Sequence, residues 1–387
     1  MRRRPSARHA RPSPILATLL VTFVVVTGCE TEAPAPPPVP TSAIAIASAL
    51  PERTAAQRCT VPGGADLHPS ACAVIAKAKT EADLVISAGS FSGDPTALGA
   101  AFGAYFGLRA GSISVRPATE AQVVAQIVSG AKQGTSTGYD VVSLSQRGLA
   151  EIDEFLHPLD WKGVWGLRDA DLVNNGHDVF GYTGLPARLI FNRDLIGVDD
   201  LPRTYLDLLA PRWRGRILME RSSVPLEYVA LAVNDLGATA VALRVARGLA
   251  GDPAGSGQAR FASSASEVLQ RVAAGEFMLG LGADGGSTAA AVGVHLIEPV
   301  PLSLFGLAVL KEARSPNLAQ LFCYWLGATA SGQQQLEAVF GRARHTSPGS
   351  STARALAGRT FIVPTAAFES RGAPALGQIF DPILGIR

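Results

Sequence analysis

The chain has 387 residues, of which 47% are hydrophobic and 17% are charged. This length allows two domains, and this balance excludes an intrinsically disordered chain. Aromatic residues make up only 6%, whereas glycine (40) and proline (26) are abundant. The composition therefore favours a tightly turned α/β protein over a helical bundle.

The first 28 residues are typical of a targeting segment. Five arginines precede an apolar run at 15–26 that is too short to span a membrane as an ordinary helix. The run ends in Val26-Thr27-Gly28-Cys29, which resembles the lipobox of bacterial lipoproteins and implies cleavage before Cys29 and lipidation of its sulfur. A plain secretory or anchor segment is the alternative. Removing the segment leaves 29 basic and 32 acidic residues, a net charge of −3, without a basic run that would indicate nucleic-acid binding.

The three other cysteines divide into a pair and a single thiol. A proline-rich tether at 30–51 precedes Cys59 and Cys72, and residues 29–79 together form an N-terminal segment outside the lobes described below. Cys59 and Cys72 flank a Pro-Gly-Gly turn signal. Because disulfides form outside the cytoplasm, we expect these two cysteines to be bonded, which would stabilise the fold by about 3 kcal/mol. Cys323 lies among apolar residues at helical spacing, which predicts a buried, unreactive thiol.

The first half of the folded region alternates between strands and helices. Strands are predicted at 83–88, 112–116 and 139–145. Helices are predicted from Pro95, with Asp94 as the N-cap, to 108, and at 120–132 and 148–156. The second helix carries an apolar stripe of Val123, Val124, Ile127, Val128 and Ala131. This alternation predicts a mostly parallel sheet that helices cover on both faces.

The second half begins with an apolar strand at 181–192 that has a single arginine, Arg188, in its middle. A proline-started helix and a turn are predicted at 199–215, and a capping box at Ser264 and Glu267 starts another helix. Further strands are predicted at 216–219, 277–282 and 296–310, and further helices after 225 and at 318–328 and 332–340. Residues 343–387 are treated as a C-terminal tail.

Several phrases, in order from about 83 to 340, resemble the periplasmic solute-binding proteins of ABC importers that bind ferric iron, thiamine or phosphonates. They include D-V-V-S-L-S-Q-R-G-L-A-E (140–151), L-I-F-N-R-D-L-I (189–196) and, as the most specific, L-P-R-T-Y-L-D-L-L-A-P-R-W-R-G (201–215). The resemblance implies a two-lobed α/β fold of type II with two crossover hinge strands and a solute held in the cleft. Lobe 1 would comprise residues 80–186 and 303–342, and lobe 2 residues 187–302.

The sequence departs from the iron-binding members of this family at the positions of their ligands. Those members carry two adjacent tyrosines where this chain has residues 283–288, which include no tyrosine. Phe91 stands where they have a histidine, and Pro117 stands near their acidic ligand. We therefore predict no metal site and no cofactor.

A small anionic or zwitterionic solute, such as an organic phosphate or phosphonate, fits the polar loops better. Helix N-termini and hydroxyl groups favour an anion, Arg188 or Arg221 would clamp it, and Asp284 would meet a cationic end. The full set of predicted ligand contacts is Ser90, Phe91, Ser92, Ser145, Arg188, Arg221, Ser222, Ser223, Asp284 and Ser287. Helix capping explains Ser222, Ser223 and Asp94 equally well, and a surface ion pair is the alternative for Arg188.

The function predicted on this basis is that of an extracytoplasmic lipoprotein that captures a solute for an ABC permease. We expect a monomer that is held at the membrane by its lipid and has no enzymatic activity, because no catalytic motif is present. An orphan sensor or scaffold lipoprotein with the same fold is the alternative, and an enzyme with a dispersed site is a third. Genes for a permease and an ATPase beside this one would favour transport.

Overall fold

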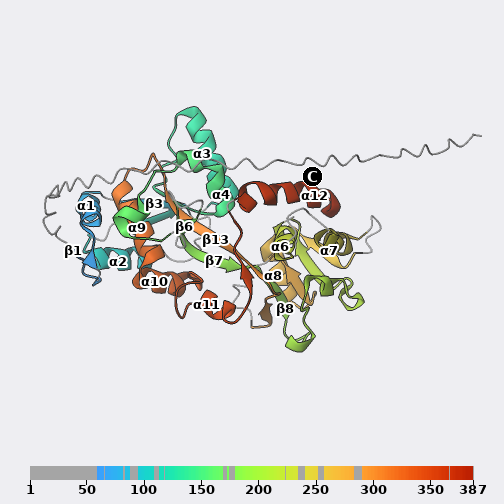
Figure 1. The fold of residues 1–387 in the computed structure, drawn as a ribbon. Coiled ribbons are helices and arrows are strands. Elements are labelled where there is room, and N and C mark those ends of the chain that lie inside the picture. The colour runs from blue at the N-terminus through green and yellow to red at the C-terminus, as the bar shows by residue number, and fades with distance from the viewer. Residues whose placement is uncertain are drawn as a thin grey trace, which may run out of the picture. The chain divides into compact units, whose positions relative to one another are not determined.

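The computed structural model describes residues 59–64, 66–81, 83–87, 95–108, 113–116, 118–168, 172–173, 179–222, 224–233, 240–251, 257–282, 290–365 and 367–386. All of them belong to one compact unit, Ala55–Arg387. Two sheets, each with its own helices, form two lobes within this unit (Figure 1). No helix in the described part of the chain has the length and hydropathy of a membrane span.

Lobe 1 is built on a sheet with the strand order β4-β3-β5-β13-β7-β6, and β14 pairs with β13. β3 pairs in parallel with β4 and β5, because a helix carries the chain back between them. β13 runs antiparallel to both β5 and β7, so the sheet is mixed. The strands are β3 (Leu84–Ser87), β4 (Ile113–Arg116), β5 (Val141–Ser145), β6 (Leu172–Val173), β7 (Val179–Pro186), β13 (Val300–Val309) and β14 (Phe361–Ile362).

Helices cover this sheet with two apolar cores. Phe102, Phe322 and Trp325 form the centre of one core, and Val123 and Ile127 of α3 belong to the other. Val124 and Val128 are partly buried beside them, whereas Ala131, at the end of the predicted stripe, is exposed. The helices are α1 (Pro69–Ala78), α2 (Pro95–Phe106), α3 (Glu120–Gln133), α4 (Gln146–Glu151), α5 (Trp161–Trp165), α9 (Pro316–Ala328) and α10 (Ala330–Phe340). The predicted helix at 148–156 is α4 followed by the short 3-10 turn Asp153–Phe155.

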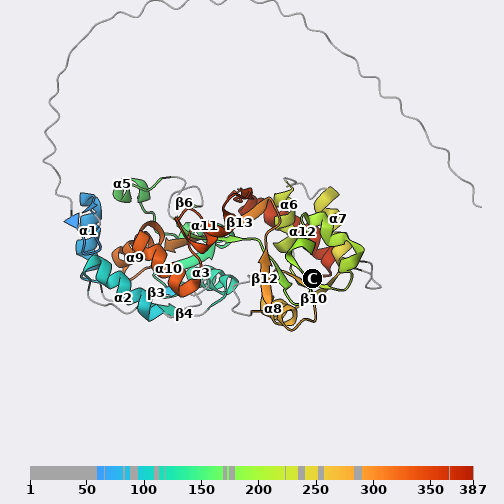
Figure 2. The same ribbon diagram turned by 90° about the horizontal axis from the view of Figure 1, so that it is seen from below.

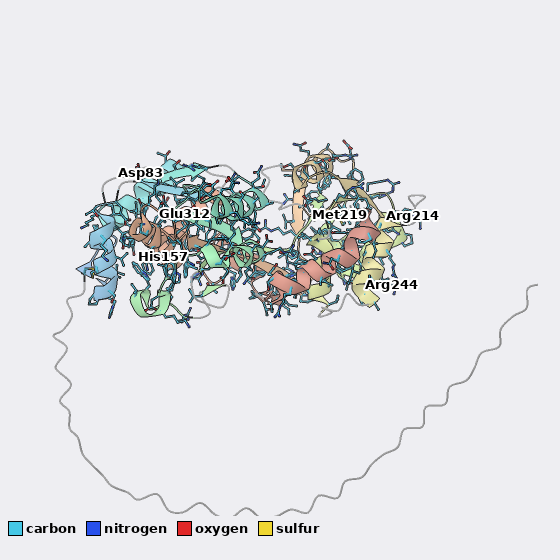
Figure 3. The ribbon with its side chains drawn as sticks, turned by 90° about the horizontal axis from the view of Figure 1, so that it is seen from above. Asp83, His157, Arg214, Met219, Arg244 and Glu312 are labelled. Carbon is cyan, nitrogen blue, oxygen red and sulfur yellow. A yellow bond between two sulfur atoms is a disulfide. The ribbon has the colours of Figure 1, made fainter. Side chains whose placement is uncertain are left out.

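Lobe 2 contains a five-stranded sheet in the order β10-β9-β11-β8-β12. β9 pairs in parallel with β10 and β11, and β8 runs antiparallel to β11 and β12. Met219 of β9 lies inside this lobe, and the exposed Arg214 and Arg244 lie at its periphery (Figure 3). The elements are β8 (Leu189–Asn192), β9 (Ile217–Glu220), β10 (Ala259–Ala262), β11 (Leu279–Leu281), β12 (Val292–His295), α6 (Val224–Ala232), α7 (Ala240–Ala250) and α8 (Ala265–Ala273).

Two local predictions in lobe 2 need correction. The predicted helix at 199–215 is a series of three 3-10 turns, Val198–Asp200, Tyr205–Leu209 and Pro211–Trp213. Prolines without an N–H group interrupt the segment and prevent a longer helix. The predicted capping box is half formed. Ser264 caps α8 by accepting the Glu267 N–H, but the Glu267 carboxylate accepts from Ser263 instead.

Two extended links, from β7 to β8 and from β12 to β13, connect the lobes, and the chain passes between the lobes again from β14 to α12. The predicted strand at 181–192 is divided, because β7 pairs in the lobe 1 sheet and β8 pairs in the lobe 2 sheet. Ala187 and Arg188 join the two strands, and the Ala187 N–H donates to the carbonyl of Pro301 at 2.7 Å. The return link, residues 296–299, leads from β12 into β13 and contains the cis peptide Glu298–Pro299. The two links therefore lie side by side at the junction of the lobes.

Residues 343–387, described above as a tail, contain ordered elements. These are α11 (Ser351–Leu356), β14, a π-helical turn at Phe368–Gly372, and α12 (Ala373–Leu384). Phe368, Phe380 and Leu384 are buried in the apolar core of lobe 2. α12 lies beside α6 and α7, while the π-helical turn contacts α4 of lobe 1 (Figures 1 and 2).

The cysteine predictions that the structure describes are confirmed. Cys59 and Cys72 form a disulfide that joins the short hairpin of β1 (Cys59–Thr60) and β2 (Asp66–Leu67) to α1. Cys323 is a buried free thiol on α9, and burial raises its pKa, so it stays protonated. Cys29 lies outside the described residues.

Candidate functional site

Four of the ten predicted ligand contacts lie within the described residues. These four are Ser145, Arg188, Arg221 and Ser222. The other six, Ser90, Phe91, Ser92, Ser223, Asp284 and Ser287, fall outside them, as does the capping residue Asp94. The loop at 283–289, where the iron-binding members carry tyrosines, is also outside the described residues.

Ser145 ends β5 and caps α4. Its hydroxyl accepts from the Gly148 N–H at 3.3 Å and donates to Oε1 of Glu120 at 2.5 Å. Its own N–H donates to Oε2 of the same carboxylate at 2.8 Å. These bonds fix the start of α4 and give Ser145 a structural role in this conformation.

Arg221 and Ser222 lie in the turn between β9 and α6. The Ser222 hydroxyl accepts from the Val224 N–H at 3.2 Å, a local bond that satisfies the first N–H of α6. The Arg221 guanidinium lies 5.3 Å from the centre of the Phe261 ring, in a cation–π contact. Both residues are at the N-terminal end of α6, but neither lines the cavity next to it.

That cavity, here called the hinge cavity, has a volume of about 230 Å³ and is bounded by both links, by β7 and β13 of lobe 1, and by lobe 2. Of the described candidates, Arg188 lines it. Apolar side chains form most of the wall, from β7, the 3-10 turn at 205–209, α6, α7 and β11. The principal ones are Leu185, Leu208, Leu226, Val229, Leu249 and Leu281.

Five polar side chains line the hinge cavity, and sequence reasoning found only Arg188. The other four are Tyr205, Glu220, Tyr228 and Ser303. The Tyr228 side chain on α6 lies near that of Ser303 on β13, and this serine opposes the rise in the pKa of the Tyr228 phenol. Burial raises the pKa of both Tyr205 and Tyr228, so their phenols stay protonated at neutral pH. Glu220 is the last residue of β9. The only sequence feature that could have marked it as a candidate is its position at the end of a strand, just before a helix.

An ion cluster next to Tyr228 joins the lobes. Nη2 of Arg147 on α4 lies 2.6 Å from Oε2 of the buried Glu227 on α6, and Nε lies 3.8 Å from Oε2 of the buried Glu369 in the C-terminal π-helical turn. Burial favours a neutral Arg147, but Glu227 and then Glu369 outweigh this and raise its pKa. The cluster therefore ties α4 of lobe 1 to α6 of lobe 2 and to the C-terminal segment.

A family model described as bacterial extracellular solute-binding protein matches residues 150–339. The predicted resemblance to solute-binding proteins is confirmed. The matched region contains both interlobe links and the whole hinge cavity. The match is to an extracellular family, in line with the expected location outside the cytoplasm. No curated protein matches the chain by sequence.

Solved structures with this fold include proteins with different ligands. Iron-bound HitA from Pseudomonas aeruginosa is 20% identical, with a TM-score of 0.61 over 78% of this chain and 99% of HitA. The ferric binding protein from Campylobacter jejuni is 16% identical, with a TM-score of 0.62 over 79% of this chain and all (100%) of its own. The PBP AgtB from A. tumefaciens R10, in complex with agropinic acid, is 18% identical, with a TM-score of 0.56 over 79% and 99% of the chains. The predicted two-lobed type II fold is confirmed.

A second cavity, of about 640 Å³, lies within lobe 1 between α10 and residues 343–350. Gln333 uses both ends of its amide there. It donates to the carbonyls of Tyr182 and Leu326 and accepts from the Arg344 N–H and the Ser347 hydroxyl. These bonds hold the chain after α10 in place, and the cavity does not touch the interlobe links. In the described part of the chain, no three His, Cys, Asp or Glu side chains are grouped to hold a metal ion.

Proposed function

We propose that this protein is the solute-capturing lipoprotein of an ABC-type importer, held at the membrane through a lipid on Cys29. Its two lobes would close on the solute by bending at the two links and then present it to a permease. The observation that carries the proposal is the hinge cavity, which borders both links and is lined by Arg188. A solute bound there would contact the segments that must bend, so binding and closure would be coupled.

The solute is anionic or zwitterionic, with an organic phosphate or phosphonate as the leading class. Arg188 supplies a guanidinium that can pair with two oxygens of one anionic group, and α6 begins at the cavity with Val224 and Pro225. Glu220 supplies a carboxylate for an amine, the role that was predicted for Asp284. The Tyr205 phenol adds a hydrogen-bond donor.

Ferric iron is the less favoured solute. The HitA structure is iron-bound, and the Campylobacter protein is described as a ferric binding protein. AgtB, in contrast, is in complex with the organic compound agropinic acid. The present sequence has no tyrosine in residues 283–288. Phenolate oxygens are hard ligands suited to ferric iron, and their absence here favours an organic solute.

A thermal-shift screen of the mature protein tests this proposal. We expect phosphonates or phosphate esters to raise the melting temperature, and thiamine and ferric iron with its anions to have no effect. Replacing Arg188 by Ala should lower the affinity for the solute at least tenfold without unfolding the protein. Replacing the exposed Arg244 of α7 by Ala should leave the affinity unchanged. Stabilisation by ferric iron alone, or full affinity in Arg188→Ala, would refute the proposal.

A further inference from the structure

Five exposed arginines gather on the periphery of lobe 2, and we call this surface the arginine edge. Two of them, Arg214 and Arg244, lie on the same peripheral side of the lobe in Figure 3. Three of the five lie in residues 211–216, just before β9, and two lie on α7, which precedes β10. The two on α7 are three residues apart and therefore share one face of the helix. The five are Arg212, Arg214, Arg216, Arg244 and Arg247.

Backbone hydrogen bonds hold the two segments of the arginine edge beside one another. The Gly215 N–H donates to the Gln258 carbonyl at 2.9 Å, and the Gln258 N–H donates to the Gly248 carbonyl at 3.1 Å. Gly215 lies between two of the arginines, and Gly248 directly follows Arg247. The side-chain amide of Gln258 also donates to the carbonyl of Leu209, at 3.3 Å. The arginines of both segments therefore occupy adjoining places on one surface.

Carboxylates do not neutralise this surface. In the part of the chain that the structure describes, no carboxylate lies within ion-pair distance of any of the five arginines. Asp207 has only a weaker charge interaction with Arg212, whose guanidinium lies 4.6 Å from the centre of the Trp213 ring. Because the chain without its targeting segment has a net charge of −3, the positive charge here is local and not a property of the whole protein.

The arginine edge is separate from the candidate solute site. It lies at the amino ends of the parallel strands β9 and β10. Glu220, at the carboxyl end of β9, lines the hinge cavity, whereas none of the five arginines does. Ligands of α/β sheets bind at the carboxyl ends of the strands. A partner at the arginine edge would therefore differ from the captured solute and could bind at the same time.

The distribution of these arginines suits a broad anionic surface better than a single small ion. A small anion is held by donors that converge in a pocket, and none of the five lines the hinge cavity or the second cavity. Anionic phospholipid headgroups present many negative charges in one plane. Each arginine near such a plane strengthens binding about fivefold.

We propose that the arginine edge is a docking surface for the anionic phospholipid headgroups of the membrane that holds the protein. The inference rests on the proposed lipid anchor, because the anchor brings the chain to a bilayer. About 30 residues separate Cys29 from Cys59, and a chain of this length can reach about 100 Å at most, so the anchor alone does not set the orientation of the lobes. Contact through the arginine edge sets which side of lobe 2 faces the membrane and leaves the hinge cavity free.

Vesicle sedimentation with an unlipidated protein tests the inference. The mature chain with Cys29→Ser carries no lipid, and the compact unit Ala55–Arg387 does not include this residue. We expect this protein to bind vesicles of phosphatidylglycerol and phosphatidylcholine at low salt and to be released at high salt. It should not bind vesicles of phosphatidylcholine alone. Equal binding to the two kinds of vesicle, or binding to neither, would overturn the inference without any further variant.

Two matched pairs of substitutions locate the binding surface. In the unlipidated protein, Arg244→Gln together with Arg247→Gln should weaken binding to the anionic vesicles at least about tenfold. Lys77→Gln together with Lys79→Gln removes the same charge from exposed positions at the end of α1 in lobe 1 and should leave binding unchanged. All four side chains are exposed, so both variants should fold, which circular dichroism checks. An equal loss in both pairs would mean that only the net charge matters, and the docking surface would be refuted.

An acidic polypeptide is the competing partner, and poly-glutamate serves as its probe. If poly-glutamate binds the arginine edge and anionic vesicles do not, the surface serves an acidic protein and the inference is wrong. The lipid anchor is tested separately by mass spectrometry of the mature protein. If Cys29 carries no lipid but the arginine edge binds anionic vesicles, the anchor is refuted and the docking surface stands.

Discussion

Glu369 is a carboxylate whose charge depends on its surroundings in the folded chain. It is 4% exposed in the π-helical turn before α12. Burial raises its pKa to about 7, Arg147 opposes this shift, and the carboxylates of Glu227 and Glu120 add to it. The three groups that act on it belong to α4, α6 and α3, so its protonation depends on how both lobes and the C-terminal segment pack together.

This raised pKa predicts a specific pH dependence of stability. Between about pH 4.5, the ordinary pKa, and about pH 7, the unfolded chain releases a proton that folded Glu369 retains. The contribution of Glu369 to the free energy of unfolding therefore falls as pH rises, by up to about 1.4 kcal/mol per pH unit, and is lost above the folded pKa. Urea unfolding at about pH 5 and about pH 7.5 should show that Glu369→Gln gains stability relative to wild type as pH rises.

The control for this experiment is Glu151→Gln, which changes an exposed glutamate at the end of α4. Its stability should follow that of the wild-type protein at both pH values. If Glu369→Gln also followed the wild type, Glu369 would be ionised in the folded protein and the assigned pKa would be wrong.

At the scale of elements, α12 shows that the C-terminal residues belong to lobe 2. Its buried face contributes Ala373, Leu376, Phe380 and Leu384 to the core that also contains α6 and α7. The chain reaches this position after β14 has paired with β13 at the start of that strand. The lobe that the sequence predicted as residues 187–302 therefore has a helix from the far end of the chain in its core.

Removing one side chain of α12 should destabilise the whole protein. Phe380 is fully buried, and Phe380→Ala is expected to lower the free energy of unfolding by about 3–5 kcal/mol, because a cavity remains in the core. The adjacent Ile379 is 42% exposed, so Ile379→Ala should cost less than about 1 kcal/mol. Denaturant unfolding measures both. Equal and small losses would mean that α12 does not pack on lobe 2 in solution.

At the scale of the whole molecule, the ion pair of Arg147 and Glu227 joins α4 of lobe 1 directly to α6 of lobe 2. Glu227 is almost fully buried, whereas the Arg147 side chain keeps 28% of its surface exposed. Rotation of the lobes that separates α4 from α6 would break the ion pair of the buried Glu227 carboxylate with Arg147, which is costly in a buried site. The pair therefore favours the conformation described above.

Breaking this pair should shift the lobes apart. We expect Arg147→Gln to increase the radius of gyration of the unliganded protein in small-angle X-ray scattering, because the bond that opposes separation is gone. Arg244→Gln removes an exposed arginine from α7 and should leave the radius unchanged. An unchanged radius in Arg147→Gln would show that this ion pair does not hold the lobes together. This measurement requires no ligand and is independent of the solute.

The sequence by itself determined the features that depend on neighbouring residues. The alternation of apolar runs and helical stripes predicted most strands and helices, and the short loop between Cys59 and Cys72 predicted their disulfide. The phrases shared with solute-binding proteins predicted the two lobes. Arg188, the only charged residue in the apolar stretch at 181–192, was a predicted ligand contact, and it lines the hinge cavity. Each of these signals lies within a short stretch of chain, where periodicity and loop length act directly.

Only the tertiary structure decided which distant residues meet. Tyr228 and Ser303 come together at the hinge cavity, and Arg147, Glu227 and Glu369 come together between the lobes, although none of these residues carries a local signal of its partner. The position of α12 was hidden for the same reason, because its apolar face has no preference for one core over another. Such contacts depend on how whole elements pack. The free energy of that packing is distributed over many residues, so no single segment of the sequence determines it.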